Sequence, residues 1–371
     1  MTKIIYLDNA ATTPVYPEVV KEMNKYMLEE YGNPSSAHVL GEQAQKAIES
    51  AKKAIASEIG SKGNEIIFTS GGTEANNIAI QGIAKANPSK KKIIISAIEH
   101  SSIYELCMKM KSQGYQIVEI PVNKRGFIDL KILEREIDDK ILIVSIMHAN
   151  NEFGVIQDIT RIGKLCREKG VLFHSDAVQS FCKEKIDVNS MNISLLSASG
   201  HKIGASKGIG FLYVKSGVKI EPIIIGGSQE LGLRPGTQNV PAIMGFARAI
   251  SIVKKINKNK IKELRDYFIE KIEFIGGKTN GSKEKRLANN IDFSFSGKDG
   301  DEIMLKLSEK GIMCSTRSAC TSKQKKENRI LKAIGLSKEE IEGALRFSLS
   351  EFNTKKEIEI VVKEFKIILN R

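Results

Sequence analysis

Predicted strands and helices alternate, with short links between them, from about residue 60 to residue 215 of this 371-residue chain. The strands are short apolar runs, for example at residues 141–147, and helical patterns fill the segments between them. Such alternation requires a crossover after each strand, so most strands must run parallel. We therefore expect an α/β fold with a doubly wound, mostly parallel sheet.

The pattern changes near residue 250. We expect one long, lysine-rich helix over residues 247–274, followed by strands and helices in the order of an α+β unit. A chain of 371 residues also exceeds the size at which one simple core is usual. The sequence therefore predicts a large domain over residues 15–250 and a smaller C-terminal domain, formed by residues 1–14 and 251–371.

The chain is basic, with 57 Lys and Arg against 44 Asp and Glu and a formal net charge of +13. Such a charge can attract nucleic acid or an acidic protein. A lysine-rich solvated surface is the simpler explanation, and no recognised nucleic-acid module is visible, so we expect no direct binding to nucleic acid. The apolar runs are too short to span a bilayer and the N-terminus lacks a signal-peptide pattern, so we expect no membrane association.

The number and spacing of the cysteines indicate whether the protein works in a reducing or an oxidising compartment. The five cysteines are Cys107, Cys166, Cys182, Cys314 and Cys320. Their odd number and the lack of a CxxC pair argue against a disulfide framework and against a zinc site, so no metal site is expected. Unpaired cysteines are typical of a reducing compartment, and we expect the protein to be cytoplasmic.

Residues 171–210 carry the most informative chemistry. Two short apolar runs within this stretch predict buried strands; the first ends near Asp176, and the second leads into Ser199, His201 and Lys202. Open α/β sheets place ligands at the carboxyl ends of such strands. Pyridoxal phosphate requires a lysine amine, a carboxylate for its pyridine nitrogen, and hydroxyl or imidazole donors for its phosphate. Alone, the lysine could be a solvated side chain and the aspartate a helix N-cap, but together they favour this cofactor.

Other strand ends add candidates. The Gly-Gly-Thr turn at residues 71–73 offers backbone N–H groups and a hydroxyl at a positive helix end, which suits a phosphate; a merely tight turn is the alternative. His100 could stack on an aromatic ring and move protons, although a lone histidine is more often an N-cap neighbour or a core residue. The amide of Asn151 could hold a cofactor hydroxyl or a substrate.

A small, polar loop is expected at about residues 314–328. Such a loop should be exposed and mobile, and a thiol beside Arg317 and several lysines should be biased toward the thiolate form. Cys320 could then move between an internal site and an external acceptor, although most loop cysteines are incidental. Arg346, on a strand of the same domain, could bind a substrate carboxylate or form only a surface salt bridge.

With these segments assembled, the chain resembles the cysteine desulfurases of the NifS/IscS type, which are pyridoxal-phosphate enzymes of fold type I related to class-V aminotransferases. The resemblance covers nearly the whole chain and rests on many ordered motifs. They are YLDNAATTP (6–14), NPSSAH (33–38), FTSGGTEANN (68–77), EHSS (99–102), NNEFGVIQDI (150–159), HSDAVQ (174–179), SGHK (199–202), GLRPGTQNV (232–240), SACTS (318–322) and RFSL (346–349).

The resemblance implies a role for each matching residue. Three would be catalytic: Lys202 would bond covalently to the cofactor, His100 would stack on its ring and transfer protons, and Cys320 would accept sulfur. The residues that would bind the cofactor are Asp176 at the ring nitrogen, Gln179 and Asn151 at the ring hydroxyl, Gly72, Thr73, Ser199 and His201 at the phosphate, and Thr237 at the phosphate from the partner subunit of a homodimer. Those that would bind the substrate are Arg346, Asn33 and Asn151.

The activity implied by the resemblance is removal of sulfur from L-cysteine. L-alanine would be released and a persulfide left on Cys320, for transfer to an acceptor protein such as an iron–sulfur scaffold, or for tRNA thiolation or cofactor synthesis. The extended SACTS loop resembles that of the NifS/IscS group rather than the short loop of the SufS group. The alternatives are a selenocysteine lyase or another β-eliminating lyase and, from a different class, a catalytically idle homologue that serves as a scaffold.

Some positions depart from the motifs of these enzymes. Leu231 and Pro235 alter the segment expected at the dimer contact, while Arg317 and Ser350 could change how the loop moves. Cys314 is an additional thiol near the loop, which could resolve the persulfide or be inert; we expect it to be inert.

Overall fold

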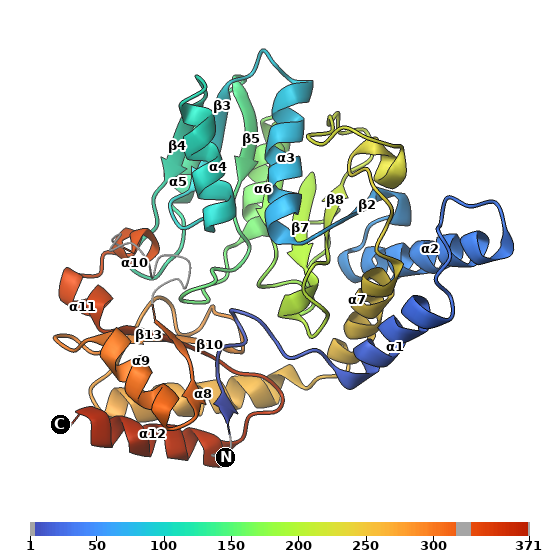
Figure 1. The fold of residues 1–371 in the computed structure, drawn as a ribbon. Coiled ribbons are helices and arrows are strands. Elements are labelled where there is room, and N and C mark those ends of the chain that lie inside the picture. The colour runs from blue at the N-terminus through green and yellow to red at the C-terminus, as the bar shows by residue number, and fades with distance from the viewer. Residues whose placement is uncertain (1–3, 317–327, 370–371) are drawn as a thin grey trace.

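The computed structural model describes residues 4–316 and 328–369, and its largest element is a seven-stranded sheet (Figure 1). The strand order is β2-β8-β7-β6-β5-β3-β4. The strands are β2 (Ile66–Thr69), β3 (Lys92–Ser96), β4 (Gln116–Ile120), β5 (Ile141–Ser145), β6 (Leu172–Asp176), β7 (Leu195–Ser199) and β8 (Gly210–Val214). Neighbours from β7 to β4 pair in parallel, whereas β8 is antiparallel to both β2 and β7. The predicted mostly parallel α/β sheet is confirmed.

Each face of this sheet is buried under helices. Side chains alternate across the strands, so in β3 Ile93 and Ile95 face one core while Ile94 faces the other. The first core lies under α3 (Gly72–Ala86) and α4 (Ser101–Lys111). The second lies under α1 (Pro17–Leu28), α2 (Val39–Ile59), α5 (Leu130–Glu136), α6 (Ile159–Glu168) and α7 (Val240–Val253).

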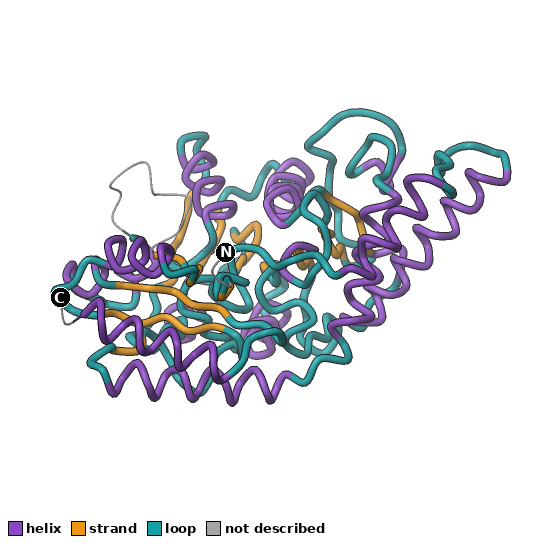
Figure 2. The backbone as a smooth tube through the Cα atoms, turned by 60° about the horizontal axis from the view of Figure 1, so that its bottom comes forward, coloured by secondary structure: helices purple, strands orange, loops and turns teal. Residues whose placement is uncertain are grey.

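The C-terminal part of the chain builds a second, antiparallel sheet with the order β12-β13-β10-β9. Its strands are β9 (Lys278–Thr279), β10 (Asn290–Ser294), β12 (Ser315–Thr316) and β13 (Ala344–Ser348). The helices α8 (Lys258–Phe274), α9 (Gly300–Glu309) and α12 (Lys355–Leu369) contribute to its core, so that helices surround the strands (Figure 2). In that core the rings of Phe293 and Phe347 stack at 5.4 Å. The short helices α10 (Arg329–Ala333) and α11 (Lys338–Glu342) precede β13.

The N-terminal segment joins this second unit. Its strand β1 (Ile5–Tyr6) pairs in parallel with β11 (Ile312–Met313). Ile5 and Leu7 are buried in the same core as the phenylalanines of the C-terminal sheet. The beginning of the chain therefore crosses from the small unit to the large one just before α1, and it passes the carboxyl ends of the large sheet on the way (Figure 1).

One local prediction was wrong. The single helix expected over residues 247–274 is two helices, α7 and α8, because Asn257 takes an extended backbone conformation and caps α8. Its side chain accepts hydrogen bonds from the backbone N–H groups of Asn259 and Lys260, which a helix passing through this position would not need. The predicted strand end near Asp176 is confirmed, since Asp176 is the last residue of β6. Within residues 4–316 and 328–369, no helix is long and apolar enough to cross a membrane.

Candidate active site

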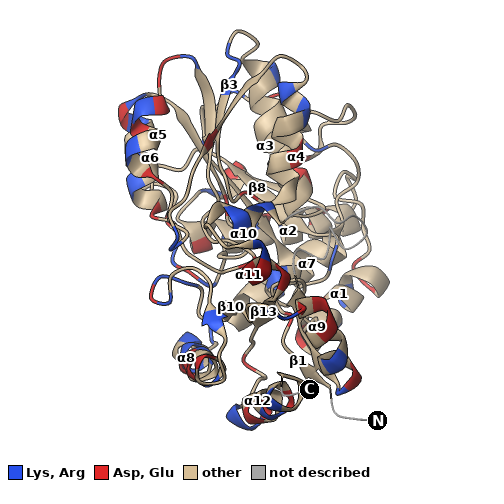
Figure 3. Ribbon diagram, turned by 90° about the vertical axis from the view of Figure 1, so that its left-hand side faces the viewer, with Lys and Arg blue, Asp and Glu red and all other residues tan. Residues whose placement is uncertain are grey.

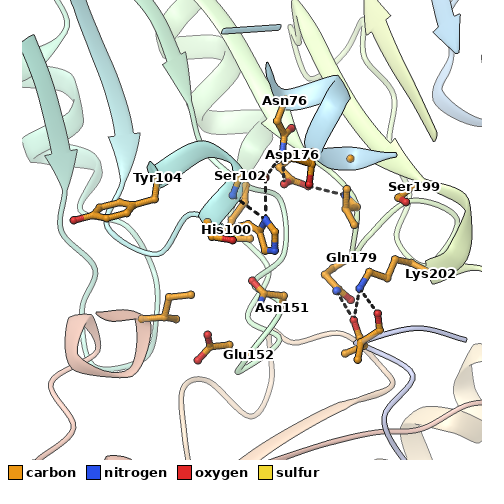
Figure 4. Close-up of a pocket in the computed structure, with 18 of the residues that line it drawn as sticks. Asn76, His100, Ser102, Tyr104, Asn151, Glu152, Asp176, Gln179, Ser199 and Lys202 are labelled. Carbon is orange, nitrogen blue, oxygen red and sulfur yellow. Dashed lines mark hydrogen bonds between the residues drawn. The ribbon is translucent and has the colours of Figure 1, made fainter. Parts of the chain in front are cut away.

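A cavity of about 790 Å³ lies at the carboxyl ends of β6 and β7, against the C-terminal unit (Figure 4). The turns that follow the strands and the first turns of α3 and α4 form its walls. Most of the residues that the sequence singled out line it together. They are Gly72, Thr73, His100, Asn151, Asp176, Gln179, Ser199, His201, Lys202 and Arg346.

Lys202 follows β7 directly and lies on a single turn of 3-10 helix, Gly200–Lys202. Its Nζ donates hydrogen bonds to the backbone oxygens of Ala10 at 2.6 Å and Ala11 at 2.8 Å. Burial, followed by repulsion from Lys183 and Arg346, lowers the pKa of Lys202 to about 7. A substantial fraction of this amine is therefore neutral and nucleophilic at neutral pH.

Asp176, at the end of β6, is 4% exposed and both of its carboxylate oxygens are hydrogen-bonded. Oδ1 accepts from the backbone N–H of Val178 at 2.9 Å, and Oδ2 accepts from the side-chain amide of Asn76 at 2.9 Å. Asn76 lies one turn into α3 and is fully buried. Asn76 belongs to the FTSGGTEANN motif, but no role was predicted for it; the only signal in the sequence is its position one helical turn after the glycine pair.

His100 is the N-cap of α4 and lines the cavity, so the N-cap explanation and the functional one are both compatible with its position. Its Nδ1 accepts from the backbone N–H of Ser102 at 3.2 Å and lies 2.9 Å from the Ser102 hydroxyl. Burial lowers the pKa of His100, partly opposed by the charge of Asp176. The ring is therefore neutral at neutral pH, and because Nδ1 accepts, Nε2 carries the proton.

The start of α3 is suited to a phosphate. The first N–H groups of a helix lack partners within the helix and point toward an anion at its positive end. Packing requires glycine at position 72, because a Cβ atom there would lie 2.5 Å from Cγ2 of Val178. Ser199 and His201 line the same cavity. Burial and the neighbouring Lys202 lower the pKa of His201 to about 4, so its ring is neutral and can donate one N–H.

The side-chain amides of Gln179 and Asn151 also line the cavity, and they differ in their hydrogen bonding. Gln179 donates through Nε2 to the backbone oxygen of Ala10 at 3.0 Å. The Oδ1 atom of Asn151 is buried and accepts no hydrogen bond from any residue within 4–316 and 328–369. A buried acceptor without a partner is rare and costly in a folded protein. It therefore marks a place where a bound molecule can donate a hydrogen bond.

Arg346 lies on β13 and approaches the cavity from the C-terminal unit. Its Nη1 donates to the backbone oxygen of Asn151 at 3.1 Å, and its Nη2 forms an ion pair with Oδ1 of Asp8 at 3.0 Å. Its Nε is buried without a partner in the described part of the chain. A cation with one unused donor at the edge of a cavity can bind a carboxylate.

Two predicted residues do not line this cavity, and a third lies outside the residues that the structure describes. Asn33 is exposed in the segment between α1 and α2, where its Oδ1 accepts from the backbone N–H of Ser35 at 2.9 Å. Thr237 is exposed in the segment before α7, on the same chain but away from the cavity lining. Cys320, like Arg317, lies outside the residues that the structure describes.

A group of residues that was not predicted from the sequence borders the cavity just after the cysteine segment. Asn328 caps α10 and donates to Oε2 of the buried Glu152 at 2.7 Å. Arg329 donates to the backbone oxygens of Ala97 and Glu99. Its guanidinium lies 3.8 Å from the centre of the Tyr104 ring. These contacts join segments far apart in sequence, so local patterns carried no signal for them.

The described ranges contain no group of histidine, cysteine and carboxylate side chains that could hold a metal ion. Among the four cysteines in those ranges, none is paired in a disulfide. Cys314 is largely buried, and burial raises the pKa of its thiol.

Comparisons with known proteins agree with this geometry. The class-V aminotransferase family matches residues 5–361. The chain is 41% identical over 377 residues to the cysteine desulfurase IscS of Dictyoglomus turgidum, which covers 100% of this chain and 96% of that protein. It is 44% identical over 368 residues to the cysteine desulfurase IscS of Methanosarcina thermophila, with 97% and 91% covered.

Solved structures show the same similarity. A NifS-like protein superposes with a TM-score of 0.94 at 35% identity, covering 99% of this chain and 100% of that one. A structure described as SspA in complex with cysteine superposes with a TM-score of 0.85 at 36% identity, covering 94% of this chain and 99% of that one.

Proposed function

This chain belongs to the class-V aminotransferase family, and on that premise we propose that it is a cysteine desulfurase that uses pyridoxal phosphate to take sulfur from L-cysteine. The observation that carries the proposal is the convergence of Lys202, Asp176 and His100 on one cavity that Arg346 also borders. The relatives named cysteine desulfurase match essentially the whole chain, which supports the same activity here.

The residues of the cavity fit the cofactor. Lys202 would bond to its aldehyde carbon, and Asp176, held in place by Asn76, would pair with its ring nitrogen. The unpartnered Oδ1 of Asn151, with Gln179, would lie at its hydroxyl. Its phosphate would be bound at the first turn of α3 by Gly72 and Thr73, and by Ser199 and His201. When bound, pyridoxal phosphate supplies an electron sink for the charge that develops as the substrate Cα proton leaves.

The chain's own residues would bind and orient L-cysteine. Arg346 would hold the substrate carboxylate through its unused Nε, while Asp8 and the backbone of Asn151 fix the guanidinium. Lys202, with its pKa near 7, would accept and return the Cα proton. His100, neutral and protonated on Nε2, would donate a hydrogen bond from Nε2 within the same cavity.

Cys320 would take the sulfur. Its thiolate attacks the substrate sulfur, so that an S–S bond forms as the Cβ–S bond breaks. The electron pair of the broken bond ends, with a proton, on the carbon that becomes the methyl group of L-alanine. Both flanks of the segment that carries Cys320 support this role: Ser315 pairs with Arg346 in the sheet, and Asn328 is bonded to Glu152 at the cavity.

We also propose that the protein forms a homodimer. Large apolar side chains are exposed on α1, just after it, and on the segment that leads to Thr237. Among them are Leu28 at 74% exposure, Tyr31 at 67%, Ile225 at 82% and Leu231 at 69%. Large exposed apolar groups of this kind mark interaction surfaces. A partner subunit on this surface would bring its Thr237 to the phosphate end of the cavity.

The acceptor of the sulfur would be a protein such as an iron–sulfur scaffold, as the IscS name of the relatives suggests. The expected cytoplasmic location stays a prediction, and so does the division into domains at residues 15–250.

The test is production of L-alanine and sulfide from L-cysteine in the presence of a reducing thiol. We expect activity in the wild type, loss of activity in Lys202→Ala, and loss of activity with retained cofactor absorbance in Cys320→Ala. Cys314→Ala is the matched control and should retain activity, since burial disfavours its thiolate. Full activity of Cys320→Ala would instead support a lyase that releases sulfide directly, such as a selenocysteine lyase.

A further inference from the structure

The short segment of residues 97–100, between β3 and α4, carries His100 to the wall of the active-site cavity. The His100 ring itself has few anchors. In the part of the chain that the structure describes, its hydrogen bonds go only to Ser102, two residues further along the same segment. The imidazole therefore moves with its own backbone, and the contacts that hold this segment decide where the ring lies.

Three successive backbone carbonyls of this segment accept hydrogen bonds from side chains that are distant in sequence. The oxygen of Ile98 accepts from Nδ2 of Asn150 at 3.0 Å. The oxygens of Ala97 and Glu99 accept from the two terminal nitrogens of one guanidinium, that of Arg329. A buried carbonyl that lacks a donor is costly, so these bonds tie the segment to its two partners.

Arg329 also contacts the chain on the other side of His100. The centre of its guanidinium lies 3.8 Å from the centre of the Tyr104 ring. Tyr104 lies four residues after His100, in the first turn of α4, and both residues line the cavity (Figure 4). A guanidinium over an aromatic ring gains a cation–π attraction, most strongly where water is excluded. One side chain thus holds the residues just before His100 and the helical turn just after it.

The backbone that carries Arg329 is itself fixed by packing. Arg329 is the first residue of α10, which lies between the large sheet and the rest of the C-terminal unit (Figure 3). The next two residues, Ile330 and Leu331, are buried in the same hydrophobic cluster as Ile98. The start of α10 is therefore packed against the very segment whose carbonyls Arg329 binds.

We propose that Arg329 is a positioning residue for His100, a role that rests on the proposed function, in which His100 stacks on the cofactor ring. Arg329 acts through the segment before α4 and through Tyr104. Its planar guanidinium reaches two carbonyls that are two residues apart and contacts an aromatic ring at the same time, which the single amine of a lysine cannot do. Replacement by lysine would keep the charge and release the segment.

The experiment is a double-mutant cycle of Arg329→Lys and His100→Asn, because such a cycle shows whether one residue acts through the other. An asparagine can still accept a hydrogen bond at the N-cap of α4, so His100→Asn removes the ring and keeps the cap. Two quantities are measured for the wild type, both single variants and the double variant. They are the dissociation constant of pyridoxal phosphate, by equilibrium dialysis, and kcat/KM for the production of L-alanine from L-cysteine.

The matched control is Arg125→Lys. Arg125 also lies over an aromatic ring, that of Phe127 at 5.5 Å, but it is exposed and does not line the cavity. In Arg329→Lys we expect the dissociation constant to rise by about three- to tenfold and kcat/KM to fall by about 10- to 100-fold, with neither changed in the control. In the His100→Asn background, Arg329→Lys should change each quantity by no more than about twofold, because no ring is left to position.

Additive effects of the two substitutions would overturn the proposal, since Arg329 would then act on the cofactor or the substrate without His100. Wild-type values in Arg329→Lys would overturn it as well. If the wild type binds pyridoxal phosphate but makes no L-alanine, the proposed reaction fails, while the cycle in the dissociation constant still decides the role of Arg329. A wild type that does not bind the cofactor would overturn both. Should Arg329→Lys fail to fold, Tyr104→Leu, which removes only the ring contact, takes its place in the cycle.

Discussion

Asn76 donates a hydrogen bond to Asp176 over 2.9 Å, from the second turn of α3 to the end of β6. The same side-chain nitrogen also donates to the hydroxyl of Ser102 at 2.9 Å. Since Ser102 in turn contacts Nδ1 of His100, one buried amide orients both the carboxylate and the imidazole of the cavity. This chain of contacts joins three strand–helix turns that are widely separated in sequence.

Asn76→Ala is expected to lower kcat/KM for L-cysteine by about 10- to 100-fold, because a hydrogen bond to a buried carboxylate is worth roughly 1.5–3 kcal/mol. The matched control is Asn77→Ala, since Asn77 donates to the backbone oxygen of Thr73 and does not line the cavity. Steady-state kinetics together with the cofactor absorbance of each variant measure the effect. Equal kcat/KM in the two variants would show that Asn76 does not position the site.

The low pKa of Lys202 predicts how the reactivity of its amine changes with pH in the cofactor-free protein. Only the neutral amine is nucleophilic, so the rate at which an amine-selective acylating reagent modifies Lys202 should rise through about pH 7. An unperturbed lysine has a pKa of about 10.4. Peptide mass spectrometry after short exposures gives the rate for each lysine. In Lys183→Met the midpoint for Lys202 should move upward, because one repelling charge is gone; a midpoint near 10 in the wild type would contradict the prediction.

The sequence predicted the large sheet and the strand-end residues well because both are encoded locally. Alternating elements reveal the strand ends, and the residues that follow them, such as His100 and Lys202, share one edge of the sheet. Contacts between residues that are far apart in sequence cannot be predicted from local sequence patterns. Asp8 pairs with Arg346 across 338 positions, and Asn328 bonds Glu152 across 176. The break before α8 was missed because the lysine-rich run favours helix on both sides of the single capping residue Asn257.

The ion pair between Arg346 and Asp8 predicts a specific effect on substrate binding. Arg346→Lys keeps the positive charge but loses the planar set of donors that contacts Asp8, the backbone of Asn151 and, in the proposed function, the substrate carboxylate. We expect KM for L-cysteine to rise by about tenfold or more. Arg248→Lys, at an exposed position of α7, is the control. An unchanged KM in Arg346→Lys would argue that the carboxylate is bound elsewhere.

The raised pKa of the buried Glu99 carboxyl group predicts that the stability of the folded protein depends on pH. This carboxyl is fully buried, and its Oε1 contacts the hydroxyl of Ser96 and accepts from the backbone N–H of Met147 at 2.8 Å. Burial raises its pKa to about 8 in the folded protein, so the folded state retains a proton that the unfolded state loses. The contribution of Glu99 to stability is therefore fully present below about pH 4.5 and is lost progressively as the pH rises to about 8.

Glu99→Gln keeps the shape of the neutral acid and removes this titration. The Tm of the wild type should fall by several degrees more than that of the variant between pH 5 and pH 8.5, as measured by thermal denaturation in buffers of constant ionic strength. Glu263→Gln, at an exposed position of α8, should follow the wild type because it leaves the buried carboxyl in place. Parallel Tm curves for Glu99→Gln and the wild type would mean that Glu99 is ionised in the folded protein, and that the hydrogen bonds from Ser96 and Met147, with the charge of Arg329, outweigh the cost of burial.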